Sequence, residues 1–273
     1  MVIPHTGYLE SGEARIYFET AGEGLPLLFI HAGVADHRQW NNEFESFASE
    51  FKVVRYDMRG FGRSEPVPGE FSHMRDLELI IDELIGDEPL TLIGCSMGGR
   101  LAMDYALEHP AAVSSLVLVG SGPSGLDLDV PSHPKEKEAE RAYEQGDWDR
   151  LAEVEAQIWL DGMGRSPEQT DPAFRKLALE MNRLALSHEA KKLGERTPDV
   201  EIPAVERLDQ LKQPTLIFIG EHDEPYSQAA ALYMQEHIPD ARLVEVPGAA
   251  HLANMERPLL FERHLRDFLQ EAN

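Results

Sequence analysis

Short apolar runs alternate with amphipathic segments along most of the chain. The apolar runs have strand length and are rich in Leu, Ile and Val, which predicts strands covered on both faces. We expect strands at residues 14–20, 25–31, 51–57, 90–95, 113–119, 214–220 and 241–246. Apolar residues at helical spacing predict helices at 74–85, 97–108, 227–237 and 258–269. This alternation predicts an α/β fold with a mostly parallel central sheet flanked by helices.

One long segment, residues 124–206, interrupts this alternation with no convincing strand. Helical patterns at 135–145, 148–159 and 173–190 are separated there by prolines. We expect a helical cap inserted over the carboxyl edge of the sheet. The core is then residues 1–123 and 207–273, and the cap is 124–206. The alternative is that these helices complete the core, but their charged faces favour an exposed surface.

The charge balance limits the partners of the chain. Lys and Arg number 25 against 49 Asp and Glu, which gives a net charge of −24. Such a chain is repelled by nucleic acid and by anionic membranes, so we expect neither as a partner. The simplest interpretation is a solvated acidic surface, and the alternative is adaptation to salt.

The sequence also bears on location and on bound groups. No apolar run approaches the ~20 residues that span a bilayer, and residues 1–10 lack the pattern of a signal peptide. We therefore expect a cytoplasmic protein. Cys95 is the single cysteine, and the histidines show no metal-binding spacing, so we expect no disulfide, metal or cofactor.

The string Gly94-Cys95-Ser96-Met97-Gly98 lies between a predicted strand and a predicted helix. A GxSxG motif in this context predicts a sharp turn that strains the backbone of its serine, with glycine needed on both sides. The serine hydroxyl then projects at the amino end of the helix, whose dipole favours developing negative charge. We predict Ser96 as a nucleophile; the alternative is a glycine turn that only packs helix on strand. The Cys95 thiol is expected to point into the core and to be inert.

Further strings, read together with this turn, carry a family resemblance. They are HAGV at 31–34, Trp40, DMRGFGRS at 57–64, GEHD at 220–223 and GAAH at 248–251. With them nearly the whole chain resembles the cap-bearing esterases and lactonases of the α/β-hydrolase fold. The resemblance implies a serine hydrolase whose triad follows the order serine, acid, histidine, which Ser96, Asp223 and His251 obey.

The oxyanion hole is less sharply determined than the triad. Its expected donors are the backbone N–H groups of Met97 and Gly33. The family usually has glycine after the histidine of the first string, whereas this chain has Ala32. The choice between Gly33 and Val34 therefore stays open.

His251 and Asp223 follow the last two predicted strands, where loops at the carboxyl edge reach the serine. His251 is the expected base and Asp223 the acid that fixes its tautomer. The rival histidines are His109, His237 and His264, and the rival acids are Glu221 and Glu224. The string at 57–64 is interpreted as structural, with Arg59 bracing its loop through backbone hydrogen bonds.

An apolar pocket beside a serine triad suits small to medium acyl esters, and we expect a monomer or homodimer. We expect the substrate pocket to involve Val34, Trp159, Met163 and Leu252. The alternatives are an enol-lactonase, a carbon–carbon bond hydrolase, a ligand receptor that keeps its triad, and a non-catalytic scaffold. Haloalkane dehalogenases and epoxide hydrolases are disfavoured because they carry aspartate at the position that Ser96 occupies here.

Overall fold

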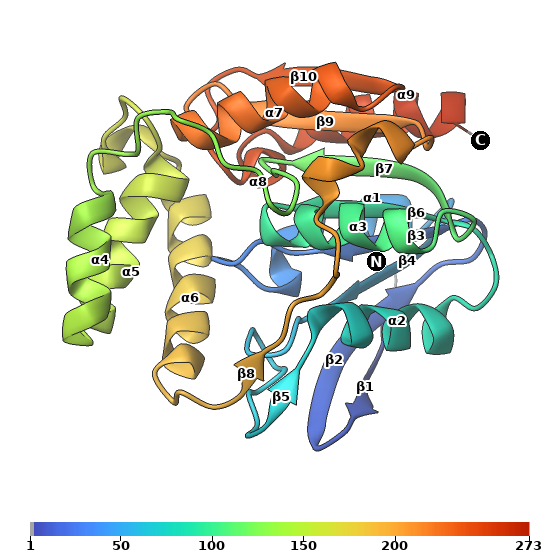
Figure 1. The fold of residues 1–273 in the computed structure, drawn as a ribbon, viewed down its shortest axis with the longest axis horizontal. Coiled ribbons are helices and arrows are strands. Elements are labelled where there is room, and N and C mark those ends of the chain that lie inside the picture. Colours follow the sequence, from blue (N-terminus) through green and yellow to red (C-terminus); the bar gives the residue numbers. More distant parts are fainter. Residues whose placement is uncertain (1–2, 273) are drawn as a thin grey trace.

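A mostly parallel sheet of eight strands forms the centre of the molecule in the computed structural model, which describes residues 3–272 (Figure 1). The strands are β1 (His5–Ser11), β2 (Ala14–Ala21), β3 (Pro26–Ile30), β4 (Lys52–Tyr56), β6 (Leu90–Cys95), β7 (Val113–Val119), β9 (Thr215–Gly220) and β10 (Ala241–Val246). Their order is β1-β2-β4-β3-β6-β7-β9-β10. Only the pairs β1–β2 and β2–β4 are antiparallel. The predicted α/β class is confirmed.

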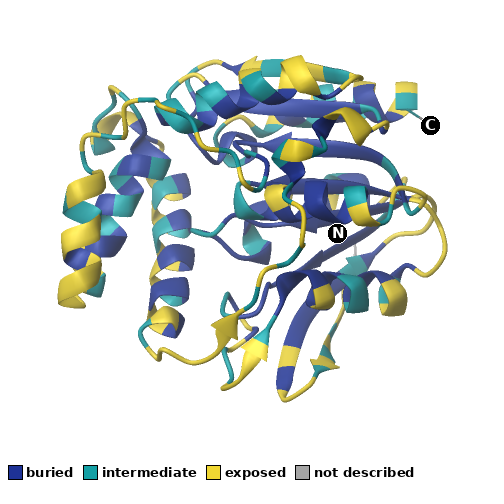
Figure 2. Ribbon diagram, viewed as in Figure 1, coloured by how far each residue is buried: buried dark blue, intermediate teal, exposed yellow. Residues whose placement is uncertain are grey.

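Helices cover both faces of this sheet. One face packs against α2 (His73–Leu84), α3 (Met97–Glu108) and α7 (Pro225–His237). The other face packs against α1 (Asn41–Phe47), α8 (Ala253–Glu256) and α9 (Pro258–Ala272). The strands β3, β6 and β9 are buried along their whole length, so they are dark blue in Figure 2. Burial on both faces explains why their sequences are continuously apolar.

Residues 124–206 carry the helices α4 (Glu136–Gln145), α5 (Trp148–Glu155) and α6 (Pro172–Glu189). These helices stand together at one end of the sheet, on the left of Figure 1. The helix predicted at 148–159 changes to a π-helical turn at Ala156–Asp161. Phe174 and Met181 of α6 belong to the hydrophobic cluster against which α9 packs. By contrast, α4 is largely exposed. The segment therefore packs on the core at one side and faces solvent at the other.

Three strands lie outside the predicted set. β1 lies at the edge of the sheet, and β5 (Glu70–Phe71) pairs in parallel with β8 (Glu195–Arg196) in a separate two-stranded sheet. The expectation that 124–206 contains no strand is wrong at β8. A two-residue strand has no hydrophobic period to detect. Among the described residues, no helix combines the length and apolarity that crossing a membrane requires.

Candidate active site

Ser96 lies at the junction of β6 and α3 with φ 52° and ψ −114°. This left-handed conformation is strained for a residue with a Cβ. The turn is close-packed: a Cβ on Gly94 meets the carbonyl oxygen of Gly98 at 2.4 Å, and one on Gly98 meets that of Ile30 at 2.4 Å. Both glycines are therefore required sterically, as the sequence motif predicts. The Ser96 N–H donates to the carbonyl of Val119 at 2.8 Å, which fixes the turn to β7.

His251 and Asp223 form a buried hydrogen-bonded pair. The imidazole Nδ1 lies 2.9 Å from Oδ1 and 3.0 Å from Oδ2 of the carboxylate. Asp223 follows β9 and His251 follows β10, so two neighbouring parallel strands deliver the pair to one edge of the sheet. Burial alone lowers the pKa of His251, but the charge and hydrogen bond of Asp223 outweigh it and raise the pKa. The carboxylate thus favours the imidazolium form.

Cys95, the residue before Ser96, contacts the backbone of His251. The Cys95 thiol lies 3.8 Å from the carbonyl oxygen of His251. Within residues 3–272, no hydrogen bond joins the Ser96 hydroxyl to the imidazole. Triad contacts are often long without substrate and tighten when it binds.

Gly120 is a residue that sequence analysis missed. It follows β7, has φ +54°, and a Cβ there lies 2.9 Å from Nδ1 of His251 and 3.0 Å from Oδ2 of Asp223. Only glycine leaves room for the histidine–aspartate pair at this point. The signal in the sequence is weak, because a glycine after a buried strand is common.

The oxyanion candidates Gly33 and Met97 lie close together. The Met97 methyl carbon is 3.9 Å from an ideal Cβ on Gly33. The loop that carries Gly33 is held by Gln39, whose side-chain oxygen accepts the N–H of Ala32 at 2.9 Å and whose amide donates to Asn254 at 3.2 Å. This bridge ties the loop that carries Gly33 to the segment that follows His251. Gln39 and Asn254 were not found by sequence analysis.

The predicted substrate-binding residues have different environments. The Trp159 ring lies 4.6 Å from the His251 ring, and Trp159 lines a cavity of about 390 Å³ with Glu224. Val34 is half-buried against the core, and Met163 exchanges hydrogen bonds with His222. Leu252 is fully buried in the core, which gives no support for contact with a substrate.

The rival residues are engaged elsewhere. Glu221 accepts the N–H of Gly248 at 2.8 Å, and Glu224 caps α7 through the N–H groups of Tyr226 and Ser227. His109 pairs with Glu78 at 3.1 Å, and His237 is exposed.

Two further predictions concern Cys95 and Arg59. Cys95 is fully buried, and burial raises the pKa of its thiol to about 12, so it holds its proton. Arg59 does not brace its loop chiefly through the backbone. It binds the carboxylate of Asp76 on α2, at 2.7 and 3.0 Å, and both oxygens of Ser11. A long guanidinium reaches a distant carboxylate more readily than sequence distance suggests.

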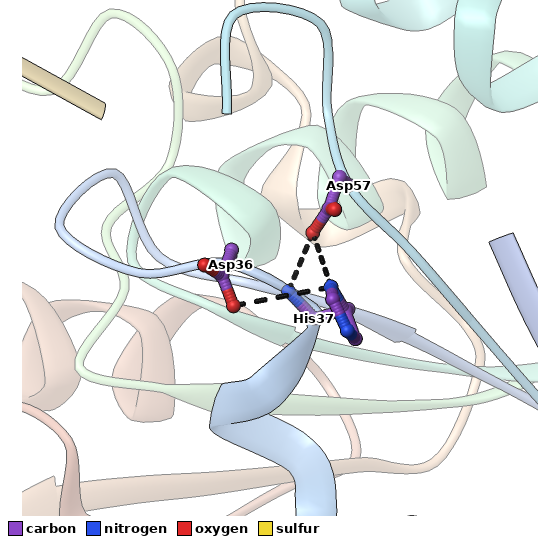
Figure 3. A group of neighbouring side chains, drawn as sticks. All are labelled: Asp36, His37 and Asp57. Atoms are coloured by element: carbon purple, nitrogen blue, oxygen red, sulfur yellow. Dashed lines mark hydrogen bonds and ion pairs between the residues drawn. The ribbon is translucent and has the colours of Figure 1, made fainter. Parts of the chain in front are cut away.

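Asp36, His37 and Asp57 form a buried cluster whose ligand atoms lie within 4.8 Å of one another (Figure 3). Asp57 Oδ1 already accepts the backbone N–H and Nδ1 of His37, both at 2.7 Å, and Oδ2 accepts the N–H of Arg63. Asp36 is paired with Arg38 at 2.6 Å. With their donors and acceptors satisfied inside the protein, these residues fit a structural network better than a metal site.

Comparison with known proteins adds the family. The family model for the alpha/beta hydrolase fold matches residues 26–258. Pimeloyl-[acyl-carrier protein] methyl ester esterase of Nitrosomonas europaea is 26% identical over 264 residues, which cover 91% of this chain and 97% of that protein. The 2-hydroxy-6-oxononadienedioate/2-hydroxy-6-oxononatrienedioate hydrolase of Comamonas testosteroni is 26% identical, with 93% and 91% covered.

Solved structures agree with this assignment. A thermophilic esterase from Thermogutta terrifontis is 27% identical with a TM-score of 0.75, and the match covers 100% of this chain and 99% of that chain. The enol-lactonase from Burkholderia xenovorans LB400 shares the fold, with a TM-score of 0.77 at 19% identity over 97% of this chain and 100% of that chain. The chain therefore belongs to the α/β-hydrolase fold family.

Proposed function

We propose that this protein is a carboxylesterase-type serine hydrolase that cleaves esters of small to medium acyl groups through an acyl-enzyme. The observation that carries the proposal is the buried pair of His251 and Asp223 beside a serine with strained backbone. The hydrolases among its relatives support the same chemistry.

In the first half of the proposed reaction, His251 takes the proton of Ser96 while the hydroxyl oxygen attacks the ester carbonyl. Asp223 accepts the hydrogen bond from Nδ1–H of His251. The other ring nitrogen, Nε2, is then the basic nitrogen that acts on the serine. The negative charge that develops on the carbonyl oxygen is held by the N–H of Met97, at the amino end of α3, and by that of Gly33.

The protonated His251 then gives its proton to the alcohol oxygen as the ester C–O bond breaks, which releases the alcohol and leaves the acyl group on Ser96. In the second half, the same imidazole activates water, which attacks the acyl-enzyme and releases the acid. The proposed steps use only groups of this chain and water. The proposed mechanism therefore requires no cofactor.

The position of His251 determines where the alcohol part of the ester lies. Because His251 must protonate the leaving group, the alcohol belongs beside the Trp159 ring, which packs at a tilt against the His251 ring. The cavity there is about 390 Å³, with Leu128, Val130 and Ile158 in its wall. We propose that residues 124–206 act as a cap, because they supply most of this wall.

A carbon–carbon bond hydrolase is the second candidate, because the Comamonas testosteroni relative is as similar as the esterase relative, at 26% identity. The same serine, histidine and aspartate suit both reactions. Assaying dienone substrates beside esters separates the two.

Removing the nucleophile is the sharpest test. We expect wild-type protein to hydrolyse nitrophenyl esters between acetate and octanoate, and Ser96→Ala to lower kcat by about 10⁴-fold or more with the fold retained. Ser187→Ala, an exposed serine on α6, is the matched control and keeps full activity. A serine-directed fluorophosphonate should label wild-type protein and not Ser96→Ala.

Inactivity of the wild-type protein toward this whole ester series contradicts the proposal. So does full activity of Ser96→Ala.

A further inference from the structure

A second cavity, of about 380 Å³, lies beside the proposed oxyanion hole. Gly33 and Met97 form part of its wall, and Phe61, Phe71 and Leu186 provide apolar surface. The β5–β8 pair at the bottom of Figure 1 closes it, because Phe71 and Arg196 of that pair line it. The cavity therefore joins the catalytic core to residues 124–206.

Arg196 reaches from β8 toward the nucleophile turn with part of its guanidinium uncommitted. Its Nη2 donates to Asp199 at 2.5 Å. Among residues 3–272, its Nη1 donates only to the thioether sulfur of Met97, at 3.7 Å. A thioether is a weak acceptor, so a carboxylate oxygen near Nη1 gains a charge-assisted hydrogen bond at little cost.

Arg59 is a second guanidinium on the same wall, and it is only 8% exposed. Its Nε and Nη2 are committed to Asp76, with Nη2 also reaching Ser11. Its third nitrogen, Nη1, makes no hydrogen bond with the described residues. The ion pair with Asp76 thus fixes the position of the Arg59 guanidinium and leaves the N–H groups of its Nη1 available to a ligand.

His73 adds a buried polar group to the cavity wall. It is 3% exposed, and its Nδ1 has no hydrogen-bond partner within residues 3–272. Its ring packs at 5.3 Å from that of Phe71 and 6.5 Å from that of Phe61. Burial, with Arg196 next in effect, lowers the pKa of His73 to about 3, so the imidazole is neutral and offers one donor and one acceptor. Buried polar atoms without a partner are uncommon in folded proteins, and a polar ligand group is one way to satisfy such an atom.

Donors outnumber acceptors at this wall. The one carboxylate that lines the cavity is Glu189, which is exposed and accepts the Tyr143 hydroxyl. Asp76 and Asp199 neutralise much of the arginine charge, but each is held by its own arginine. A ligand rich in acceptors is therefore favoured locally, although the whole chain carries a net charge of −24.

We propose that this cavity binds the acyl part of the substrate, and that Arg196, Arg59 and His73 receive a carboxylate at the far end of that acyl group. The preferred substrates are then monoesters of short dicarboxylic acids. This inference rests on the proposed function. It assigns the acyl group to this cavity because the oxyanion candidates line it, while the alcohol lies beside Trp159.

The test compares monomethyl adipate with methyl hexanoate, which has the same number of acyl carbons and no carboxylate. Wild-type protein should show a kcat/KM for monomethyl adipate about tenfold or more above that for methyl hexanoate, since hydrogen bonds to charged groups contribute at least this factor. Arg196→Gln should lower kcat/KM for monomethyl adipate more than for methyl hexanoate, so that the ratio of the two falls toward one. Arg242→Gln is the matched control, because it also removes one arginine of a surface ion pair, far from the cavity.

A second variant and a wild-type measurement guard against a folding defect. His73→Phe keeps an aromatic ring against Phe61 and Phe71, and it should lower the preference severalfold. Free adipate should inhibit nitrophenyl butyrate hydrolysis by wild-type protein more strongly than hexanoate does. Equal rates on the two methyl esters with equal inhibition by the two acids overturn the inference and leave the esterase proposal intact. Inactivity on every ester overturns the proposed function itself.

Discussion

Gly120 has no chemistry of its own, yet it shapes the candidate active site. Its absent side chain leaves the space that the His251–Asp223 pair occupies, with a Cβ only 2.9 Å from Nδ1 of the histidine. A methyl group there must displace the imidazole of His251 or the carboxylate of Asp223. Displacements near 1 Å are enough to cost about 10²-fold in rate.

Gly120→Ala should therefore lower kcat/KM on nitrophenyl esters by about 10²-fold. Gly12→Ala is a fitting control, because Gly12 also has positive φ, at +64°, and has nothing within 4 Å of its Cβ position. Both variants lose stability from backbone strain, and only Gly120→Ala should lose activity. Equal activity of the two variants, measured well below their Tm, contradicts this role.

The acid limb of the pH profile depends on His251. Asp223 raises the pKa of this histidine, with a smaller contribution of the same sign from Glu224. The reaction needs the neutral imidazole, so kcat/KM should rise with pH through a pKa above the ordinary histidine value and then level off. The profile of a neutral ester between about pH 5 and 9 measures this.

Glu224→Gln should move that limb to lower pH, because one of the charges that stabilise the imidazolium is removed. Glutamine keeps a side-chain oxygen that can cap α7. A limb that stays in place or moves to higher pH argues against His251 as the titrating base.

At the scale of single elements, α1 buries a carboxyl group against the sheet. Glu43 is 1% exposed, one of its oxygens has no partner, and the other accepts from Asn254 at 3.3 Å. Burial raises the pKa of Glu43 from 4.5 to about 8, only partly offset by these hydrogen bonds. The folded protein therefore holds a proton that the unfolded chain releases.

This linkage has a definite sign. Between about pH 4.5 and 8 the folded state binds more protons than the unfolded state, so this group makes stability fall as pH rises. Glu43→Gln should remove that slope and raise the Tm at pH 8 and above relative to wild type. Glu45→Gln, an exposed position on the same helix, should leave the profile unchanged. A variant less stable than wild type at pH 9 contradicts the argument.

How far sequence predicts an element depends on how its surroundings restrict it. β6 and β7 have the predicted bounds because burial demands apolar runs and the turns end them, and β10 has them because Leu243, Val244 and Val246 keep an apolar pattern at the other edge of the sheet. β1 escapes prediction because it lies at the edge and half its residues are exposed. The required glycines of the nucleophile turn follow from local geometry. The Gln39–Asn254 bridge does not, because its partners are 215 residues apart.

At the scale of the whole molecule, the excess of 49 acidic over 25 basic residues should make stability depend on salt. Self-repulsion among solvated carboxylates is screened as the Debye length shrinks from about 10 Å at 0.1 M to about 3 Å at 1 M salt. We expect the Tm to rise with sodium chloride and to level off by about 0.5 M, where screening is nearly complete. A Tm that keeps rising up to molar salt indicates salt adaptation. A Tm that does not rise with salt excludes salt adaptation.

The strands that flank residues 124–206 in the chain, β7 and β9, are direct neighbours in the sheet. The chain leaves the sheet after β7 and returns at its neighbour β9. Residues 124–206 therefore take the place of a short crossover connection. Lengthening, shortening or exchanging this segment leaves the pairing of every major strand undisturbed. If these residues form the proposed cap, substrate preference can change through them, by evolution or by grafting in the laboratory, while the strands that precede Ser96, Asp223 and His251 keep their pairing.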